Sequence, residues 1–325
     1  MMSPRSLIAL AAAACAATAA AVTSLRSLGR ERQLLIFHAG SLSVPFRNVS
    51  KAFTKNHPGV VVKAEAAGSR DSARKISDLG RVCDVFGSAD REVIADLLMP
   101  DFADFCISFA GNELAVGYTS KSRFADRINS KNWYEVLMRD DVIFGRADPN
   151  RDPCGYRTLM LFQLAEKYYN KPGLAARLER KGTGRYIRPK ETDLLALLES
   201  GEIDYVFIYR SVIRQHKLGL LRLPDRINLS SPTYASFYRQ ARVRVAGPKP
   251  GRTVTLRGAP IVYAVTIPRG SPNRKLAEAW VALLLSPGGR RILKECGQRP
   301  LSPARADGYD NLPPSLKPFC AADKR

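Results

Sequence analysis

The chain has 325 residues, a formal net charge of +21, a hydrophobic content of 45% and a charged content of 25%. These values are typical of a globular protein with room for two ordinary domains, and they exclude a collagen-like or largely disordered chain. The positive charge raises nucleic-acid binding as an alternative. Lysine and arginine are scattered, however, and no nucleic-acid-binding motif occurs, so we expect no nucleic-acid partner.

The N-terminus predicts export. Arg5 precedes an apolar stretch at 7–22, with small-residue cleavage options after it, which is typical of a signal peptide within residues 1–24. A membrane-spanning helix needs about 20 apolar residues, and this stretch is shorter. A lipid anchor at Cys15 and an uncleaved N-terminal anchor are the alternatives. All three interpretations place the rest of the chain outside the cytoplasm, in the periplasm or at the cell surface.

Five further cysteines follow Cys15. Exported proteins commonly contain disulfides, so pairing is expected for some of them. The pairings that we consider are Cys83 with Cys106 and Cys296 with Cys320. No Cys-x-x-Cys motif and no metal-binding histidine spacing occurs, and we expect no zinc site and no cofactor.

The N-terminal third alternates short apolar runs with helical periodicity. Strands are predicted at 34–37, 60–64 and 84–88, and helices at 44–53, 69–79 and 93–99. This order favours a mostly parallel sheet flanked by helices.

The rest of the chain continues this pattern. Strands are predicted at 113–118, 142–145, 204–209 and 260–267, and helices at 156–169, 192–199, 273–285 and 288–295. We therefore expect an α/β protein with two lobes, one formed by 33–118 plus 260–325 and the other by 119–259. Ligands of such proteins bind beyond the carboxyl ends of the strands and between domains.

Two predicted strands end in the same way. Gly40-Ser41 and Gly68-Ser69 each follow a strand and precede a helix. The start of a helix offers free backbone N–H groups, glycine allows close approach, and serine adds a hydroxyl donor. An ordinary helix-capping serine is the alternative at each position. Two such sites in matching contexts favour a shared anion-binding site.

Two more segments carry candidate residues. In "DPNRDPCGYRTLM" (148–160), Asp152 suits a helix cap, Pro153 the first helical position, and Cys154 would bring a backbone N–H group to the helix start. A secreted cysteine hydrolase, with Cys154 as nucleophile and His38 as base, is an alternative that lacks an orienting third group. Glu191 begins another predicted helix, where an acidic residue is also favoured for structural reasons.

Five segments together resemble a known family. "FHAGSLSVPF", "AAGSRDSARKI", "DPNRDPCGYRTLM", "SGEIDYVFIYRSV" and "GAPIVYAVTIP" are similar to the archaeal-type molybdate/tungstate-binding proteins of ABC transporters, from about Leu34 to about Pro303. The resemblance implies a type II periplasmic-binding-protein fold, with two lobes of mixed, mostly parallel sheets closing over an oxyanion.

The resemblance also implies site residues. The oxyanion-binding positions that it matches are Gly40, Ser41, Ser69, Asp152, Pro153, Cys154, Glu191 and Tyr209. Asp152 and Glu191 would be ligands to the tungsten or molybdenum atom of the bound oxyanion. The chain departs from the expected pattern at Arg151, which adds positive charge beside Asp152, and in the basic segment "RKGTGRYIRPK" before Glu191.

The resemblance implies that the two carboxylates discriminate between oxyanions. They would repel sulfate or phosphate. Hexavalent tungsten or molybdenum, by contrast, is electron-poor, can exceed four ligands, and suits hard oxygen donors. The expected protein is thus a non-enzymatic, extracytoplasmic receptor for tungstate or molybdate. Its partners would be a membrane permease and an ATPase, and a monomer is expected. A receptor for another oxyanion, such as sulfate or phosphate, is the alternative in the same class.

Overall fold

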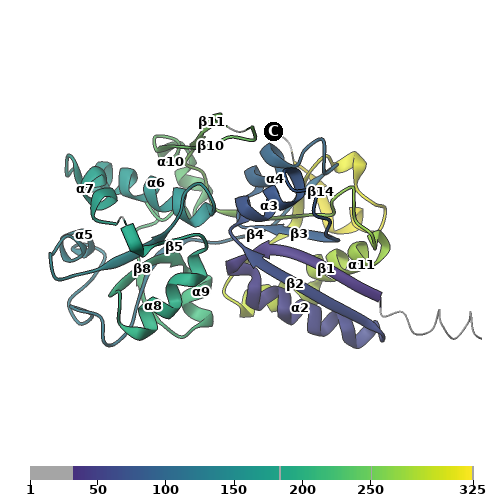
Figure 1. The fold of residues 1–325 in the computed structure, drawn as a ribbon, viewed down its shortest axis with the longest axis horizontal. Coiled ribbons are helices and arrows are strands. Elements are labelled where there is room, and N and C mark those ends of the chain that lie inside the picture. Colours follow the sequence, from purple (N-terminus) through teal and green to yellow (C-terminus); the bar gives the residue numbers. More distant parts are fainter. Residues whose placement is uncertain (1–31, 183, 250, 324–325) are drawn as a thin grey trace, which may run out of the picture.

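The computed structural model describes residues 32–182, 184–249 and 251–323. The chain forms two α/β lobes that lie side by side, each built around its own sheet (Figure 1). Within the described ranges, no helix is long and apolar enough to cross a membrane. The predicted signal peptide at 1–24, with Cys15, lies outside the described residues.

The first lobe contains a seven-stranded mixed sheet. Its strands, in spatial order, are β14 (Cys320–Ala322), β13 (Arg299–Asp307), β4 (Cys106–Gly111), β12 (Val262–Thr266), β3 (Val85–Ser88), β1 (Arg32–Ala39) and β2 (Val60–Ala67). Strand β1 pairs in parallel with β2 and β3, whereas β12 runs antiparallel to β3 and β4. The parallel half is the part that the strand–helix alternation predicted.

Helices cover both faces of this sheet. They are α2 (Ser43–Asn56), α3 (Ser69–Ser77), α4 (Arg91–Leu97), α11 (Arg274–Leu285) and α12 (Pro287–Glu295). Successive residues of β1 point to opposite faces, so Ile36 packs in the core that contains Phe46 of α2, and Phe37 packs in the core that contains Val93 of α4. Burial on both faces explains why β1 is a continuous apolar run.

The second lobe contains a five-stranded mixed sheet and a hairpin. The sheet order is β7 (Ile187–Arg188), β6 (Phe144–Ala147), β8 (Tyr205–Tyr209), β5 (Leu114–Tyr118) and β9 (Gly219–Arg222). The helices are α5 (Trp133–Leu137), α6 (Pro153–Tyr168), α7 (Leu174–Lys181), α8 (Leu194–Ser200), α9 (Arg210–Gln215) and α10 (Ala235–Tyr238). The long helix α6 was predicted from its apolar periodicity.

The sheets divide at a different place from the predicted lobe boundary. Strand β5, which we assigned to the end of the first lobe, pairs antiparallel with β8 and β9 of the second sheet. The first crossover therefore lies at 112–113 rather than after 118. An apolar run shows that a strand exists, but its sheet is decided by partners distant in sequence. The return crossover, between β11 and β12, lies near the predicted boundary at 259–260.

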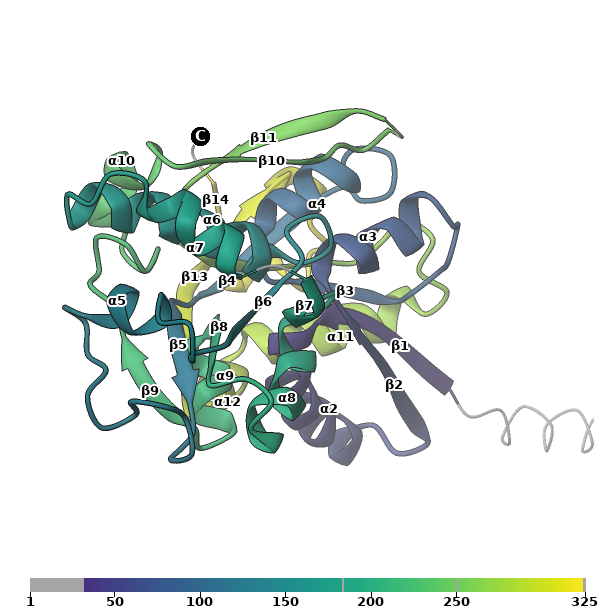
Figure 2. The same ribbon diagram turned by 60° about the vertical axis from the view of Figure 1, so that its left-hand side comes forward.

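A two-stranded hairpin, β10 (Arg242–Ala246) with β11 (Thr253–Arg257), was not predicted. It extends beside α6 toward α3 and α4 of the first lobe (Figure 2). The Arg74 side chain on α3 donates hydrogen bonds to the carbonyl oxygens of Ala246 (3.2 Å) and Gly247 (3.0 Å). The hairpin thus links the two lobes.

The disulfide pairings that we considered do not form. All five cysteines in the described part of the chain are free and buried. They pack as small apolar side chains, which is a common role for free cysteine.

Phe207 is a test of packing in the second lobe. This fully buried side chain lies with its ring centroid 5.0 Å from Phe162, 5.5 Å from Phe144 and 5.8 Å from Trp133. We expect Phe207→Ala to lower the free energy of unfolding by about 3–5 kcal/mol, measured by urea unfolding. Leu79→Ala, at a side chain that is 70% exposed, is the control and should change it by less than about 0.5 kcal/mol. Equal effects would contradict the described packing.

Candidate functional site

The two Gly-Ser segments lie at the same edge of the first sheet. Strands β1 and β2 are parallel neighbours, and Ala39 pairs with Ala67 at their carboxyl ends. Ser41 follows in a short 3₁₀ helix, η1 (Gly40–Leu42), and Ser69 is the first residue of α3. Both serines are fully buried. The structure thus brings together the two loops that the sequence paired.

Both glycines touch the second lobe. A Cβ atom on Gly40 would lie 2.9 Å from the Glu191 Oε2 atom. A Cβ atom on Gly68 would lie 2.3 Å from the Arg151 carbonyl oxygen. At Gly68 the obstructing atoms belong to the backbone, so only glycine allows this loop to approach the other lobe so closely. At Gly40 they belong to side chains, which would have to move to admit a Cβ atom.

Asp152 joins two elements of the second lobe. As the sequence predicted, it caps α6, and its Oδ1 atom accepts a hydrogen bond from the Cys154 N–H group (2.7 Å). Its Oδ2 atom accepts from the Glu191 N–H group (3.3 Å), at the start of the 3₁₀ helix η3 (Glu191–Asp193). Pro153 occupies the first position of α6. The Cys154 N–H group that we expected at the anion is therefore bonded to Asp152.

Glu191 is the unusual side chain of the site. It is fully buried, and neither carboxylate oxygen hydrogen-bonds to any residue that the structure describes. Burial, then the negative charge of Glu191, and then the proximity of the two carboxyl groups within hydrogen-bonding range raise the pKa of Asp152 well above its ordinary value. A protonated Asp152 could therefore donate to Glu191, whereas an ionised Asp152 could not. Buried carboxylates normally have hydrogen-bond partners. The two Glu191 oxygens thus have capacity for a strong additional partner.

Tyr209 lies at the end of β8 and is also fully buried. Its Oη atom accepts a hydrogen bond from Arg157 Nη1 (2.9 Å), and Arg157 also donates to the Ala89 carbonyl oxygen (2.6 Å). The Arg157 guanidinium forms a buried ion pair with Asp90 (3.0 Å) across the lobes. Arg157 lies within the quoted segment "DPNRDPCGYRTLM", but nothing in the sequence indicated Ala89 or Asp90 as its partners.

The serine hydroxyls have partners within the protein. The Ala89 N–H group donates to Ser69 Oγ (3.0 Å). Tyr263 of β12 donates to Ser41 Oγ (2.9 Å), and Asn112 Nδ2 donates to Tyr263 Oη (2.9 Å). Sequence reasoning missed Asn112 and Tyr263, because a single tyrosine in an apolar strand is usually only a core residue.

Arg151 links the lobes. Its side chain forms an ion pair with Asp71 of α3 (2.7 Å). Its carbonyl oxygen accepts hydrogen bonds from the N–H groups of Arg70 (3.1 Å) and Asp71 (3.3 Å). Two N–H groups in the first turn of α3 are therefore bonded to the other lobe. The added positive charge beside Asp152 serves contact between the lobes, which are closed on each other in this structure.

Cys154 and His38 each have another hydrogen-bond partner and a shifted pKa, which disfavours the alternative of a cysteine nucleophile. The buried Cys154 thiol donates to the Phe207 carbonyl oxygen (3.5 Å), and burial raises its pKa well above the ordinary value. Burial also lowers the pKa of His38 to about 4, and its Nδ1 atom lies 2.8 Å from the Ala39 carbonyl oxygen. A thiol with a raised pKa is a poor nucleophile.

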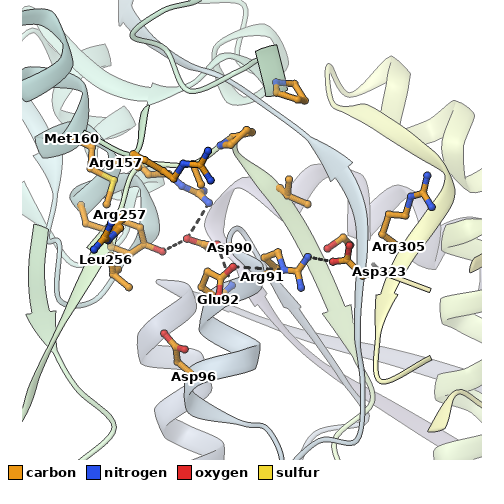
Figure 3. A pocket seen from close by; sticks show the side chains of 18 of the residues that line it. Asp90, Arg91, Glu92, Asp96, Arg157, Met160, Leu256, Arg257, Arg305 and Asp323 are labelled. Carbon is orange, nitrogen blue, oxygen red and sulfur yellow. Dashed lines mark hydrogen bonds and ion pairs between the residues drawn. The ribbon is translucent and has the colours of Figure 1, made fainter. Parts of the chain in front are cut away.

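A cavity of about 610 Å³ lies beside these residues, between α4, α6 and β11 (Figure 3). Arg157 and Asp90 line it, whereas none of the predicted site residues does. Arg157 also bonds Tyr209, so the ion pair stands between the cavity and the predicted residues. Among the described residues, no group of three or more His, Cys, Asp or Glu side chains could hold a metal ion.

Comparison with known proteins identifies related chains. Residues 34–299 match the family described as bacterial extracellular solute-binding protein. An uncharacterized solute-binding protein from Petrotoga mobilis is 48% identical over 287 residues, covering 88% of this chain and 89% of that protein. The molybdate/tungstate-binding protein WtpA from Pyrococcus abyssi is 41% identical over 311 residues, covering 88% of this chain and 89% of that protein.

A solved structure shows the same fold. The periplasmic molybdate-binding protein of Azotobacter vinelandii superposes with a TM-score of 0.59 at 16% sequence identity, covering 82% of this chain and 98% of that chain. The expected type II periplasmic-binding-protein fold is confirmed.

The raised pKa of Asp152 predicts a pH-dependent stability. A buried carboxyl whose pKa is raised stabilises the fold while it is protonated, and this contribution is lost as the pH rises through that pKa. We expect Asp152→Asn, which keeps an acceptor for the Cys154 N–H group, to lose less thermal stability than wild type between about pH 5 and pH 8.5 without ligand. Asp126→Asn, at an exposed carboxylate, is the control. Parallel pH profiles for wild type and Asp152→Asn would contradict this prediction.

Proposed function

The chain belongs to the family of bacterial extracellular solute-binding proteins, and we propose that it captures tungstate or molybdate for an ABC importer. The observation that carries the proposal is the Glu191 carboxylate, which is fully buried, has no hydrogen-bond partner among the described residues, and lies beside Asp152. The 41% identity to a molybdate/tungstate-binding protein supports this ligand class.

The carboxylates determine which anion fits. A second negative charge beside Glu191 is unfavourable, and an anion such as sulfate would add further repulsion. Tungsten and molybdenum in their oxyanions are electropositive centres that accept additional hard oxygen ligands. Glu191 and Asp152 would each supply a carboxylate oxygen to this centre. The hydroxyls of Ser41, Ser69 and Tyr209 would donate hydrogen bonds to its oxo atoms.

Capture requires the lobes to move. Ser41 and Ser69 belong to the first lobe, whereas Asp152, Glu191 and Tyr209 belong to the second, so a ligand contacts both sets only in the closed arrangement. A ligand that gains contacts from closure shifts the population toward the closed state. All five side chains are buried when the lobes are closed, so entry requires them to part.

This role defines the partners and the location. The closed, loaded receptor would dock as a monomer on a membrane permease that works with an ATPase. It would act outside the cytoplasm as a binding protein rather than as an enzyme. The family match to extracellular solute-binding proteins supports this location.

Glu191→Gln tests the carboxylate directly. The substitution keeps the size of the side chain and removes its charge, so the tungsten or molybdenum centre loses an anionic ligand. We expect the affinity for tungstate and molybdate, measured by isothermal titration calorimetry, to fall by at least about 100-fold. Wild type should not bind sulfate under the same conditions.

Glu199→Gln is the matched control, because Glu199 lies on the neighbouring helix α8 and is exposed. It should bind tungstate as wild type does. Wild-type binding of sulfate as tight as that of tungstate would instead identify a general oxyanion receptor and overturn the proposal.

Gly68→Ala tests lobe closure. Gly68 has a φ of −57°, which alanine adopts readily, but the added Cβ would meet the Arg151 carbonyl oxygen of the other lobe at 2.3 Å. We therefore expect unchanged folding of each lobe and an affinity for tungstate at least about tenfold weaker. Small-angle X-ray scattering should show less compaction on adding tungstate than wild type shows.

Gly270→Ala is the control for this experiment. Its Cβ would meet only Val82, at an ordinary distance of 3.7 Å. Normal compaction and affinity in Gly68→Ala would show that this contact does not limit closure.

A further inference from the structure

The three hydroxyl groups of the site share one bonding pattern. Ser41 Oγ accepts from Tyr263, Ser69 Oγ accepts from the Ala89 N–H group, and Tyr209 Oη accepts from Arg157. A hydroxyl group has one hydrogen and can accept through its oxygen at the same time. Since each oxygen already accepts from the protein, each hydrogen is left to donate elsewhere.

At Ser41 the direction of hydrogen bonding, which group donates and which accepts, depends on Asn112. The Asn112 Oδ1 atom accepts from the Glu113 N–H group (2.9 Å), which fixes the orientation of the amide. Its NH₂ group then donates to Tyr263 Oη (2.9 Å) and to Ser211 Oγ (2.8 Å). Tyr263 accepts from Asn112, so its own hydrogen is directed to Ser41.

Burial keeps this arrangement in one protonation state. Asn112 and Tyr263 are almost completely buried, and burial raises the pKa of Tyr263 far above its ordinary value. The phenol therefore keeps its hydrogen at neutral pH. An amide does not titrate in this range, so neither member of the pair changes its hydrogen-bonding role with pH.

We propose that Asn112 and Tyr263 are positioning residues that fix the direction of hydrogen bonding at Ser41, so that its hydroxyl donates to the bound anion. This inference rests on the proposed function. A site with fixed donors at Ser41, Ser69 and Tyr209 selects an anion whose oxygens accept hydrogen bonds, as the oxo atoms of tungstate and molybdate do.

The hydrogen bonds from Asn112 to Tyr263 and from Tyr263 to Ser41 do not cross the cleft between the lobes. Ser41 and Tyr263 both belong to the first lobe, and Asn112 follows β4 in the crossover. The bonds of Arg157, which donates to Tyr209, are different, because those to Ala89 and Asp90 join one lobe to the other. The Ser41 donor is therefore oriented before closure, which lowers the cost of ordering it during binding.

Asn112→Asp reverses the direction of the hydrogen bonds that lead to Ser41, with little change in the shape of the side chain. An aspartate oxygen in place of the NH₂ group accepts from Tyr263, which then accepts from Ser41 and turns the Ser41 hydrogen away from the anion. We expect the affinity for tungstate to fall by about 30-fold, as for the loss of a charge-assisted hydrogen bond. Calorimetry measures this, and thermal unfolding checks that the variant folds.

Adding Tyr263→Phe separates the effect of the reversed hydrogen bonds from the effect of the new negative charge. In the Asn112→Asp background it removes the acceptor for the Ser41 hydrogen, so the double variant should bind tungstate at least about threefold more tightly than Asn112→Asp alone. If the new negative charge alone caused the loss, Tyr263→Phe would restore nothing, and the proposal would be overturned.

A second comparison does not depend on the folding of Asn112→Asp. Tyr263→Phe alone should weaken tungstate binding by about fivefold, and it should have no effect when Ser41 is already replaced in Ser41→Ala. Equal losses in both backgrounds would show that Tyr263 does not act through Ser41, and would overturn the proposal. Wild type that binds neither tungstate nor molybdate would instead refute the proposed function itself.

Discussion

The constraint on which this site depends is the presence of two acidic side chains in one buried space. Asp152 is held by hydrogen bonds from two N–H groups, yet burial and the charge of Glu191 still raise its pKa. Glu191 is buried without such partners among the described residues. This arrangement opposes folding unless Asp152 is protonated or the two side chains meet an electropositive centre. Under the proposed function, binding of tungsten or molybdenum displaces the proton and converts the unfavourable pair into a ligand pair.

The excess of positive charge has a structural use at the interface between the lobes. Arg70 and Arg74 donate to carbonyl oxygens of the other lobe, and Arg151 and Arg157 form ion pairs there. None of these four is among the residues expected to contact the anion. The buried pair with Asp90 neutralises Arg157, so Tyr209 accepts a strong hydrogen bond while the site gains little net positive charge. These four arginines thus bond one lobe to the other rather than contacting the anion.

The sequence revealed the parts of the site that are set by local order along the chain. Two strands that both end in Gly-Ser and are parallel neighbours must place both serines at one edge, and α6 begins at the capping residue Asp152 as its motif predicted. The sheet to which β5 belongs could not be read in this way, because pairing depends on distant strands. The same holds for Tyr263, which lies 222 residues from its partner Ser41. The considered disulfides failed because buried free cysteines and paired ones look alike in sequence.

The hydrogen bonds that lead to Ser41 and those made by Arg157 differ in whether they join the two lobes. The bonds among Asn112, Tyr263 and Ser41 lie within the first lobe and the crossover, so they do not depend on contact across the cleft. Arg157, in contrast, reaches the first lobe only when the cleft is closed. Under the proposed function, the first lobe presents an oriented donor to an arriving anion, and closure then adds Glu191, Asp152 and Tyr209. In the closed arrangement the anion meets both carboxylates, so an anion without an electropositive centre disfavours closure.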